Sequence, residues 1–380
     1  MTFRKVIFWS HLVVGVAAGL VILLLATTGL LLTYENQLTQ LSERRFDVVL
    51  QQAEPIRAEE LAARALEETG GKASALIYDK DPQVPVAAVV GRGDKLYLHP
   101  ETGAVLGDSD TALAKFFETV EHLHRWFALE GEGRDFGKAV TGAANLGFLG
   151  LIVTGLYLWW PKAWKWRIVR LNLWFRRGLP NAKARDFNWH HVFGFWAIVP
   201  LLAIVISGAV ISYPWASDLV FRAYGEEPVA MRRPGGGGGP AAPADTGVGL
   251  QYVLDQARAV DPEWQRITLS FPQGQGRPTT SAEVDTGTGR QPDKKVTLTY
   301  AMEDGALVAT KGQGNQTPAR QARVFLRFLH TGEVYGLWGQ TIAGLASLFT
   351  LVMVWTGLAL AWRRLVMPML RGRKARSGAA

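Results

Sequence analysis

The residues of this chain best suited to chemistry are two histidines at matching places in two long apolar segments. His11 lies 18 residues before Gly29, and His190 lies 18 residues before Gly208. An ionisable side chain in an apolar segment of membrane-spanning length indicates a functional site, because its burial in lipid is costly. Neutral imidazole is a standard axial ligand of haem iron, and glycine lets a flat macrocycle approach the backbone closely. We therefore expect His11 and His190 to hold one group.

A second pair of histidines precedes the other two long apolar segments. His124 and His330 each follow a leucine near the end of a short helical pattern. Two histidines from two helices are enough for a bis-histidine haem, whereas a zinc site needs three or four ligands. Four histidines in two layers therefore predict two non-covalent haem b groups. A span of about 23 residues covers about 35 Å, which leaves a gap suitable for electron tunnelling between two haems placed inward from its ends.

Two further histidines leave the ligand assignment open. His191 could replace His190, and His122 could replace His124. A glycine follows His190 by four residues, as one also follows His11, and this match favours His190 over His191. His122 falls on the polar side of its helical pattern, which favours His124 as the ligand. A polar group at the membrane interface and a proton relay are the other interpretations of such histidines.

Haem propionates require cations or hydrogen-bond donors near the iron ligands. Arg125 and Arg327 stand within three residues of the second pair of histidines and are the candidates on that side. Further candidates are Arg134, Arg4, Lys5 and Arg185. The chain has no cysteine, which excludes disulfides, thiolate-bound iron–sulfur clusters and covalent attachment of haem. Electron transfer of this kind needs no side chain as catalytic acid, base or nucleophile.

Four apolar segments exceed the roughly 20 residues that cross a bilayer, and these segments must position the histidines. The predicted transmembrane helices cover 6–34, 137–161, 187–217 and 337–362. The water-facing parts are 35–110, 111–136, 162–186, 218–320, 321–336 and 363–380. The first apolar run is too long for a signal peptide and lacks a small-residue cleavage site, so we expect an uncleaved anchor.

Basic residues predict the orientation of the chain. The N-terminal tail, the 162–186 loop and the 363–380 tail hold 16 of the 41 basic residues and one acid, Asp186. The other parts hold 25 basic and 32 acidic residues. The positive-inside rule therefore predicts a bacterial inner-membrane protein with cytoplasmic termini and periplasmic domains. The net charge of +8 reflects this topology, and no basic patch indicates nucleic-acid binding.

The two large water-facing parts have the same predicted architecture, in which one helix precedes short strands. The helices are expected at 55–70 and 249–260. In the second part, a glycine linker at 235–239 precedes the helix, and three strands are expected at 266–271, 295–300 and 306–310. The predicted fold class is an α-helical membrane protein with four transmembrane helices, an internal duplication and two α+β extracytoplasmic domains.

These motifs resemble the PepSY-associated transmembrane family over nearly the whole chain. The resemblance also rests on the Thr-Gly pairs in the spans and on the two helix-plus-sheet domains. The histidine motifs that carry it are His11-x-x-x-Gly15, Leu123-His124, Trp189-His190-x-x-x-Gly194-Phe195-Trp196 and Leu329-His330-Thr331-Gly332-Glu333. Within the family, the chain looks most like the FoxB-type inner-membrane siderophore reductases.

This resemblance implies a di-haem protein that reduces ferric siderophores in the periplasm, with PepSY-like external domains. It carries haem ligation onto the four paired histidines, namely His11, His190, His124 and His330. The implied partners are the ferric siderophore, the lipid bilayer and an electron donor, either a quinol or a cytoplasmic reductase, since no Rossmann or flavin motif is present. The alternatives are a non-enzymatic, membrane-anchored PepSY protein that binds a protease or a sensor, and a siderophore permease.

Overall fold

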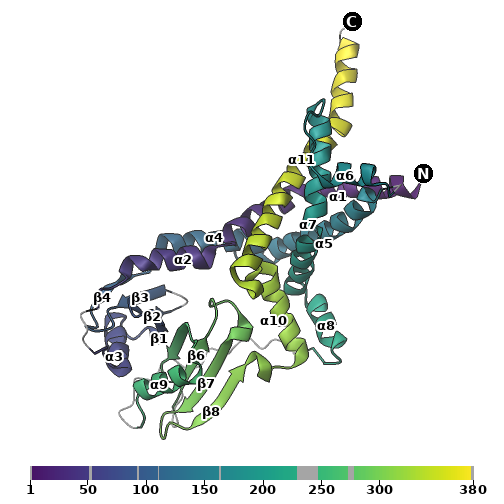
Figure 1. Ribbon diagram of the computed structural model, residues 1–380. Helices are drawn as coiled ribbons and strands as arrows, with labels where there is room; N and C mark the ends of the chain where they lie inside the picture. Colours follow the sequence, from purple (N-terminus) through teal and green to yellow (C-terminus); the bar gives the residue numbers. More distant parts are fainter. Residues whose placement is uncertain are drawn as a thin grey trace. The chain divides into compact units, whose positions relative to one another are not determined.

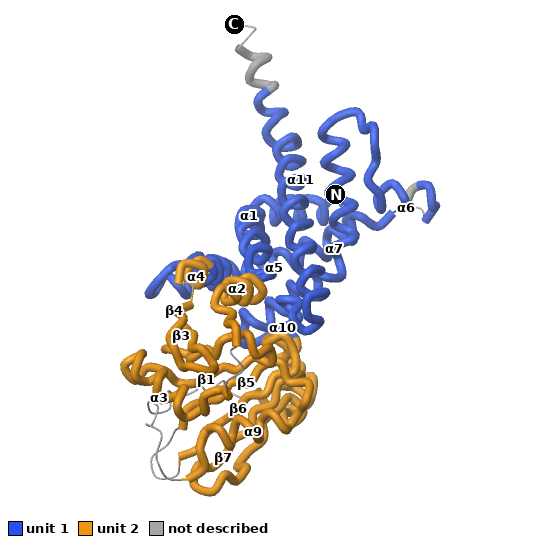
Figure 2. The backbone as a smooth tube through the Cα atoms, turned by 60° about the vertical axis from the view of Figure 1, so that its left-hand side comes forward, with its two compact units in different colours: residues 1–34, 117–220, 326–380 blue, residues 35–116, 221–325 orange. Residues whose placement is uncertain are grey.

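A computed structural model describes residues 2–50, 54–91, 94–109, 111–161, 164–228, 247–272 and 278–377 of the chain. The predicted glycine linker at 235–239 lies outside the described residues. The chain divides into two compact units, which Figure 2 shows in separate colours. The membrane unit comprises 1–34, 117–220 and 326–380, and the sheet unit comprises 35–116 and 221–325.

Four long helices form the membrane unit (Figure 1). They are α1 (Phe3–Leu32), α5 (Gly133–Trp159), α7 (Ala182–Ser212) and α11 (Gly336–Ser377). Each has the length and the apolar composition of a membrane-spanning helix. The protein is therefore a mostly helical membrane protein, in agreement with the sequence analysis.

The helices α7 and α11 extend beyond the predicted spans. Asn181 caps α7, because its side-chain oxygen accepts a hydrogen bond from the backbone N–H of Ala184. The helix therefore includes Asp186, which the sequence analysis assigned to the 162–186 loop. At the other end of the chain, α11 continues past the predicted end at 362 and contains Pro368.

The long helices pack against one another along their lengths. α1 and α7 contact both α5 and α11. The buried residues at the centre of the bundle are small or branched, namely Ile152, Ala197, Leu201, Val205 and Ala346. On the outside, Leu20, Val199 and Trp355 are each at least 70% exposed. Helices that are apolar on their outer faces as well as at their centre are typical of membrane spans, where lipid covers the exposed side chains.

Short helices precede and follow the long ones. α4 (Thr111–Trp126) precedes α5, and α10 (Pro318–Thr331) precedes α11, close to the positions that the sequence predicts. The sequence analysis missed three helices, which are α2 (Glu35–Glu43), α6 (Trp166–Leu173) and α8 (Pro214–Ala223). Short 3-10 helices cover Arg44–Phe46, Pro292–Lys294, Gln313–Asn315 and Glu333–Tyr335.

One continuous antiparallel sheet of eight strands forms the sheet unit, in the order β4-β3-β2-β1-β5-β6-β7-β8. The strands are β1 (Ala73–Asp79), β2 (Val86–Val90), β3 (Asp94–Leu98), β4 (Val105–Asp108), β5 (Arg266–Ser270), β6 (Thr279–Asp285), β7 (Lys295–Ala301) and β8 (Leu307–Gly312). The sequence analysis missed β6, whose residues include only two apolar side chains. The two predicted domains are therefore two halves of one sheet.

The halves of the sheet meet where β1 pairs with β5. Leu76 lies opposite Leu269 in this pairing, and both residues are fully buried. A single hydrophobic core extends under both halves and includes residues of α3 (Ala58–Glu68) and α9 (Leu250–Val260). The separate domains expected from the sequence share this core because each half contributes four strands of the same sheet and one helix.

The N-termini of α3 and α9 cap each other. The side chain of Glu59 accepts a hydrogen bond from the backbone N–H of Gln251, at 2.8 Å. The side chain of Gln251 in turn accepts one from the backbone N–H of Ala58, at 3.0 Å. These contacts satisfy N–H groups that a helix leaves without partners in its first turn, and they join the two halves of the sheet unit.

Candidate functional site

Two histidines face each other between α1 and α7, toward the end of the bundle at which α1 begins. We call this end the inner end, and His11 with His190 the inner pair. The centroids of the two rings lie 6.4 Å apart. A metal held end-on between two imidazoles, about 2 Å from each nitrogen, separates the ring centroids by about 6 Å. The inner pair therefore has the spacing of two axial ligands on one iron.

The outer pair, at the opposite end of the bundle, consists of His124 on α4 and His330 on α10. Their ring centroids lie 6.3 Å apart, nearly the same separation as in the inner pair. Burial lowers the pKa of His124 to about 4 and also lowers the pKa of His330. Both rings are therefore neutral near pH 7, which is the form that binds a metal.

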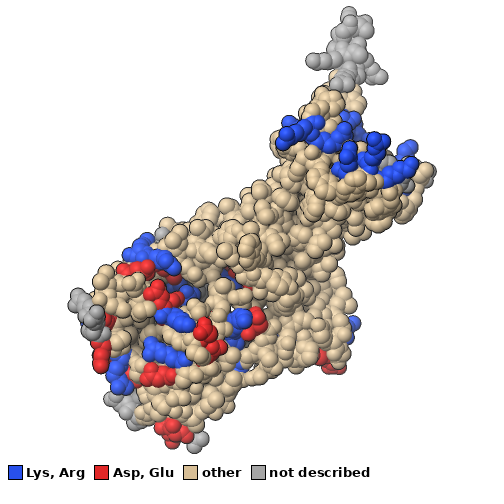
Figure 3. Space-filling view, in the orientation of Figure 1, with Lys and Arg blue, Asp and Glu red and all other residues tan. Residues whose placement is uncertain are grey.

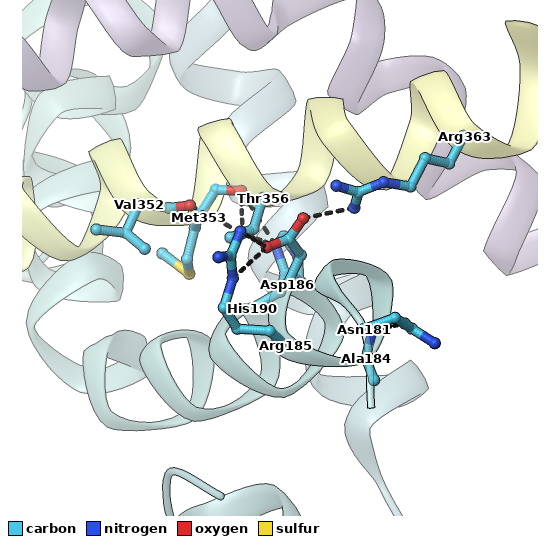
Figure 4. Close-up of polar contacts among 9 residues, drawn as sticks. All are labelled: Asn181, Ala184, Arg185, Asp186, His190, Val352, Met353, Thr356 and Arg363. Carbon is cyan, nitrogen blue, oxygen red and sulfur yellow. Dashed lines mark hydrogen bonds and ion pairs between the residues drawn. The ribbon is translucent and has the colours of Figure 1, made fainter. Parts of the chain in front are cut away.

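In the inner pair, hydrogen bonds determine which ring nitrogen carries the proton. Nδ1 of His190 lies 3.1 Å from the carbonyl oxygen of Met353 and 3.1 Å from Oγ1 of Thr356 (Figure 4). A carbonyl oxygen can only accept, so Nδ1 is the donor. Nδ1 of His11 lies 2.9 Å from Oγ1 of Thr154, whose own proton goes to a carbonyl of its helix at 2.7 Å. That hydroxyl oxygen therefore accepts from His11.

The outer pair repeats this arrangement. Nδ1 of His330 lies 2.8 Å from the carbonyl oxygen of Ile204 and 3.4 Å from Oγ of Ser207. Nδ1 of His124 lies 2.8 Å from Oγ1 of Thr28, whose proton goes to a carbonyl of α1 at 2.7 Å. In the inner pair, His190 has a carbonyl and a hydroxyl partner, whereas the partner found for His11 is a hydroxyl. In the outer pair, His330 and His124 both have a backbone partner as well as a hydroxyl.

These hydrogen bonds leave Nε2 as the nitrogen with the free lone pair in all four rings. Within the described part of the chain, the bonds found for these rings all go to Nδ1. A partner on the other ring nitrogen orients a ligand histidine, sets its tautomer and raises its basicity. All four histidines are therefore prepared to bind a metal through Nε2.

A glycine lies against each imidazole at a place where an added side chain would contact the ring. A Cβ atom added to any of these glycines would lie 3.1–3.5 Å from Cε1 of the histidine that it faces. The glycine and histidine partners are Gly155 with His11, Gly357 with His190, Gly29 with His124 and Gly208 with His330. The sequence analysis expected the mid-span glycines to admit a macrocycle, whereas the structure shows them against the imidazole of a neighbouring helix.

Each of these glycines follows the hydroxyl residue that contacts Nδ1 of the same histidine. Each long helix therefore carries one dipeptide, which we call a cradle, that receives one imidazole. The cradles are Thr28-Gly29, Thr154-Gly155, Ser207-Gly208 and Thr356-Gly357. Sequence reasoning treated these dipeptides as markers of a repeat and missed the role of their hydroxyls. The recurrence of one dipeptide per span was the available signal.

The competing histidines have other contacts. Nδ1 of His191 donates to the carbonyl oxygen of Phe187 on its own helix, at 2.9 Å. His122 lies 4.0 Å from Glu118, and its ring contacts that of Trp126. The structure therefore pairs His190 rather than His191 with His11, and His124 rather than His122 with His330.

The arginines proposed for haem propionates contact protein groups. Arg125 donates to Glu121 at 2.6 Å, and its guanidinium lies over the ring of Trp126. Arg327 lies over the ring of Phe328. Cations over aromatic faces are stabilised by the electrostatic attraction of the ring. Propionate binding by Arg125 and Arg327 stays a prediction.

The donor set of each pair fits a haem and does not fit a bare metal ion. Among the described residues, no group of three or more His, Cys, Asp or Glu side chains is placed to hold a metal. Zinc requires three or four protein ligands, whereas bis-histidine haem requires two, because the porphyrin supplies the other four nitrogens. Two opposed imidazoles with free Nε2 atoms meet this requirement at each end of the bundle.

The comparison with protein families agrees with this architecture. The family described as PepSY-associated TM region matches residues 8–374, which include all four paired histidines and all four cradles. The chain belongs to this family of membrane proteins. A comparison with curated proteins gives no match.

Proposed function

We propose that this protein is a di-haem b oxidoreductase of the bacterial inner membrane, similar to the FoxB-type siderophore reductases. It takes electrons on the cytoplasmic side and reduces ferric siderophores in the periplasm, which releases Fe(II). The observation that carries this proposal is the presence of two opposed imidazole pairs whose Nδ1 atoms are all engaged and whose Nε2 atoms are free.

The residues of the bundle would hold the cofactor at two depths. Bound haem supplies one-electron redox chemistry. His11 and Thr28 are 17 residues apart on α1, and His190 and Ser207 are 17 residues apart on α7. At 1.5 Å per residue, each of these separations spans about 26 Å of helix. The same length on two helices supports two sites near opposite faces of one bilayer.

The distribution of cations supports the proposed orientation. Figure 3 shows Lys and Arg side chains gathered at one end of the long helices. The described basic residues near the inner end are Arg4, Lys5, Lys165, Arg167, Arg170, Arg176, Arg177, Lys183, Arg185, Arg363 and Arg364. Because basic residues are retained on the cytoplasmic side, the inner pair would face the cytoplasm and the outer pair the periplasm.

The proposed reaction is the transfer of one electron to Fe(III) held by oxygen ligands. Fe(III) is a hard ion that such chelators bind far more tightly than Fe(II), so one electron releases the metal and leaves the chelator intact. A quinol or a reduced cytoplasmic flavoprotein would supply two electrons in two single steps and reduce two ferric ions. The reaction makes and breaks no bond to carbon, and it requires no catalytic acid, base or nucleophile from the protein.

Anaerobic mixing tests the proposal without knowledge of the natural donor. The purified protein is reduced with dithionite, freed of excess reductant, and mixed with a ferric hydroxamate chelate and an Fe(II)-specific dye. We expect the haem absorbance to return to the oxidised spectrum while one Fe(II) appears for each haem that is oxidised. The matched control is the gallium(III) chelate, which has the same charge and a similar size but cannot be reduced at this potential.

Two results contradict the proposal. Protein that is colourless after expression with added haem has no electron carrier, and this result favours the non-enzymatic PepSY protein or the permease. The second result is haem protein that stays reduced in the presence of the ferric chelate, as it does with the gallium chelate. Such a protein carries electrons to another acceptor.

A further inference from the structure

Asp186 is a buried acid near the inner pair, and the proposed electron transfer does not use it. The residue is 1% exposed. One carboxylate oxygen accepts hydrogen bonds from Arg185, at 3.1 and 2.9 Å, and the other accepts one from Arg363 on α11 (Figure 4). A buried carboxylate on a membrane helix is costly unless it is paired, so its presence indicates a specific role.

The pairing of Asp186 with Arg363 joins the same two helices that position His190. Asp186 lies four residues before His190 on α7, which is about one turn toward the inner end. Arg363 lies seven residues after Thr356 on α11, which runs in the opposite direction, so it also lies toward the inner end. Side chains on a helix are directed toward its N-terminus, which lets the long Arg363 side chain extend back to Asp186.

The corresponding positions beside His11 carry no charge. Ile7 lies four residues before His11, and Pro161 lies seven residues after the hydroxyl partner of His11. At this place Arg4 donates a hydrogen bond to the carbonyl oxygen of Leu158, at 2.7 Å, in the last turn of α5. One histidine of the inner pair is therefore flanked by a helix cap, and the other by a buried ion pair.

We infer that Asp186 is a positioning residue for His190. Its ion pair with Arg363 fixes α7 against α11 one turn from the ligand, and this keeps Nδ1 of His190 on Met353 and Thr356. The inference rests on the proposed function only for the nature of the group that His190 binds. The fixed orientation and tautomer of the His190 imidazole are expected in the protein with or without that group.

Three variants separate this role from a general need for charge. Asp186→Asn leaves the partly buried Arg363 without its counter-charge and weakens the connection between α7 and α11. Replacing both partners with leucine (D186L with R363L) removes both charges and retains apolar packing, an exchange that is often neutral or stabilising at buried ion pairs. Lys183→Ala is the matched control, because this exposed lysine lies on the same helix as Asp186 and its loss leaves both ion pairs of Asp186 in place.

The test measures haem per chain and the electron paramagnetic resonance spectrum of each full-length variant in detergent. We expect Asp186→Asn to weaken haem binding at the inner pair by about 10- to 100-fold, the usual effect of losing a group that orients a ligand. One low-spin signal would then disappear or shift while the other stays unchanged, which shows that the bundle is still folded. Lys183→Ala and the double leucine variant would keep both signals.

Two patterns overturn the inference. One is an Asp186→Asn variant with two haems and unchanged signals. The other is loss of both haems in Asp186→Asn and in the double leucine variant alike, which indicates a general failure to fold. Wild-type protein without haem contradicts the proposed function instead. In that event the ¹⁵N spectrum of labelled histidine decides: loss of the hydrogen-bonded Nδ1–H signal of His190 in Asp186→Asn supports the inference, and an unchanged signal overturns it.

Discussion

The inner and outer pairs have nearly equal geometry but are built from different kinds of helix. His11 and His190 lie within the long helices α1 and α7, and their cradles come from α5 and α11. His124 and His330 lie on the short helices α4 and α10, and their cradles come from α1 and α7. The packing of the four spans alone therefore defines the inner pair, whereas the outer pair also depends on two short helices.

The two members of the inner pair also differ in their hydrogen bonds. His190 has a backbone carbonyl in addition to a hydroxyl, whereas the partner found for His11 is a hydroxyl. A backbone carbonyl is retained in every side-chain variant. We therefore expect the histidines of the inner pair to respond unequally to the loss of their hydroxyls.

Adding a side chain at a cradle glycine should have the largest effect. In Gly208→Val, the new Cβ would lie 3.1 Å from Cε1 of His330 and would displace its ring. We expect the variant to lose the outer haem only, and Gly357→Val to lose the inner haem only. The measurement is haem per chain with the spectrum of the remaining haem. Gly150→Val is the control, since no atom lies within 4 Å of its added Cβ. Two haems in Gly208→Val would show that the outer imidazole is not confined.

Removing a cradle hydroxyl should have an intermediate and unequal effect. Thr154→Val deprives His11 of its hydrogen-bond acceptor, and we expect haem affinity at the inner pair to fall about 10- to 100-fold. Thr356→Val should have a smaller effect, because His190 keeps the carbonyl of Met353. Titration of haem into the haem-depleted proteins measures both affinities. Equal losses in the two variants would refute the role assigned to the carbonyl.

Replacing the competing histidines should have the smallest effect. His191→Ala and His122→Ala remove side chains that lie outside both pairs, and both variants should retain two haems and wild-type spectra. Redox titration of each variant checks this expectation. Loss of a haem in either variant would show that the replaced histidine, and not its neighbour in the pair, is the ligand. The ring spacing of that pair would then not predict its ligands.

The sequence predicted the membrane unit well because its signals are strong and local. Long apolar runs indicate spans directly, and the matched positions of His11 and His190 predicted a pair that the structure brings together. The cradle hydroxyls were missed because the contact between Thr154 and His11 joins residues 143 positions apart. A single sequence contains no signal that assigns a particular threonine to a particular histidine.

The sequence predicted the sheet unit less completely because its assembly depends on long-range pairing. Each half was foreseen as a helix with strands, but the pairing of Leu76 with Leu269 that makes one sheet could not be read from local pattern. The strand β6 was missed because its polar residues resemble a loop. Asp186 was assigned to a loop because a charged residue usually marks the end of an apolar span. Its partner Arg363 is 177 positions away in the sequence, so their ion pair is apparent only in the structure.

Haem content and the reduced-minus-oxidised spectrum of the wild type and four histidine-to-alanine variants decide whether each histidine pair holds one haem. We predict two haem b per wild-type chain and one in each of His11→Ala, His190→Ala, His124→Ala and His330→Ala. The first two variants should share one residual spectrum, and the last two should share the other. A wild-type chain without haem, or variants whose residual spectra do not group in these pairs, would show that the four histidines do not hold two haems in this way.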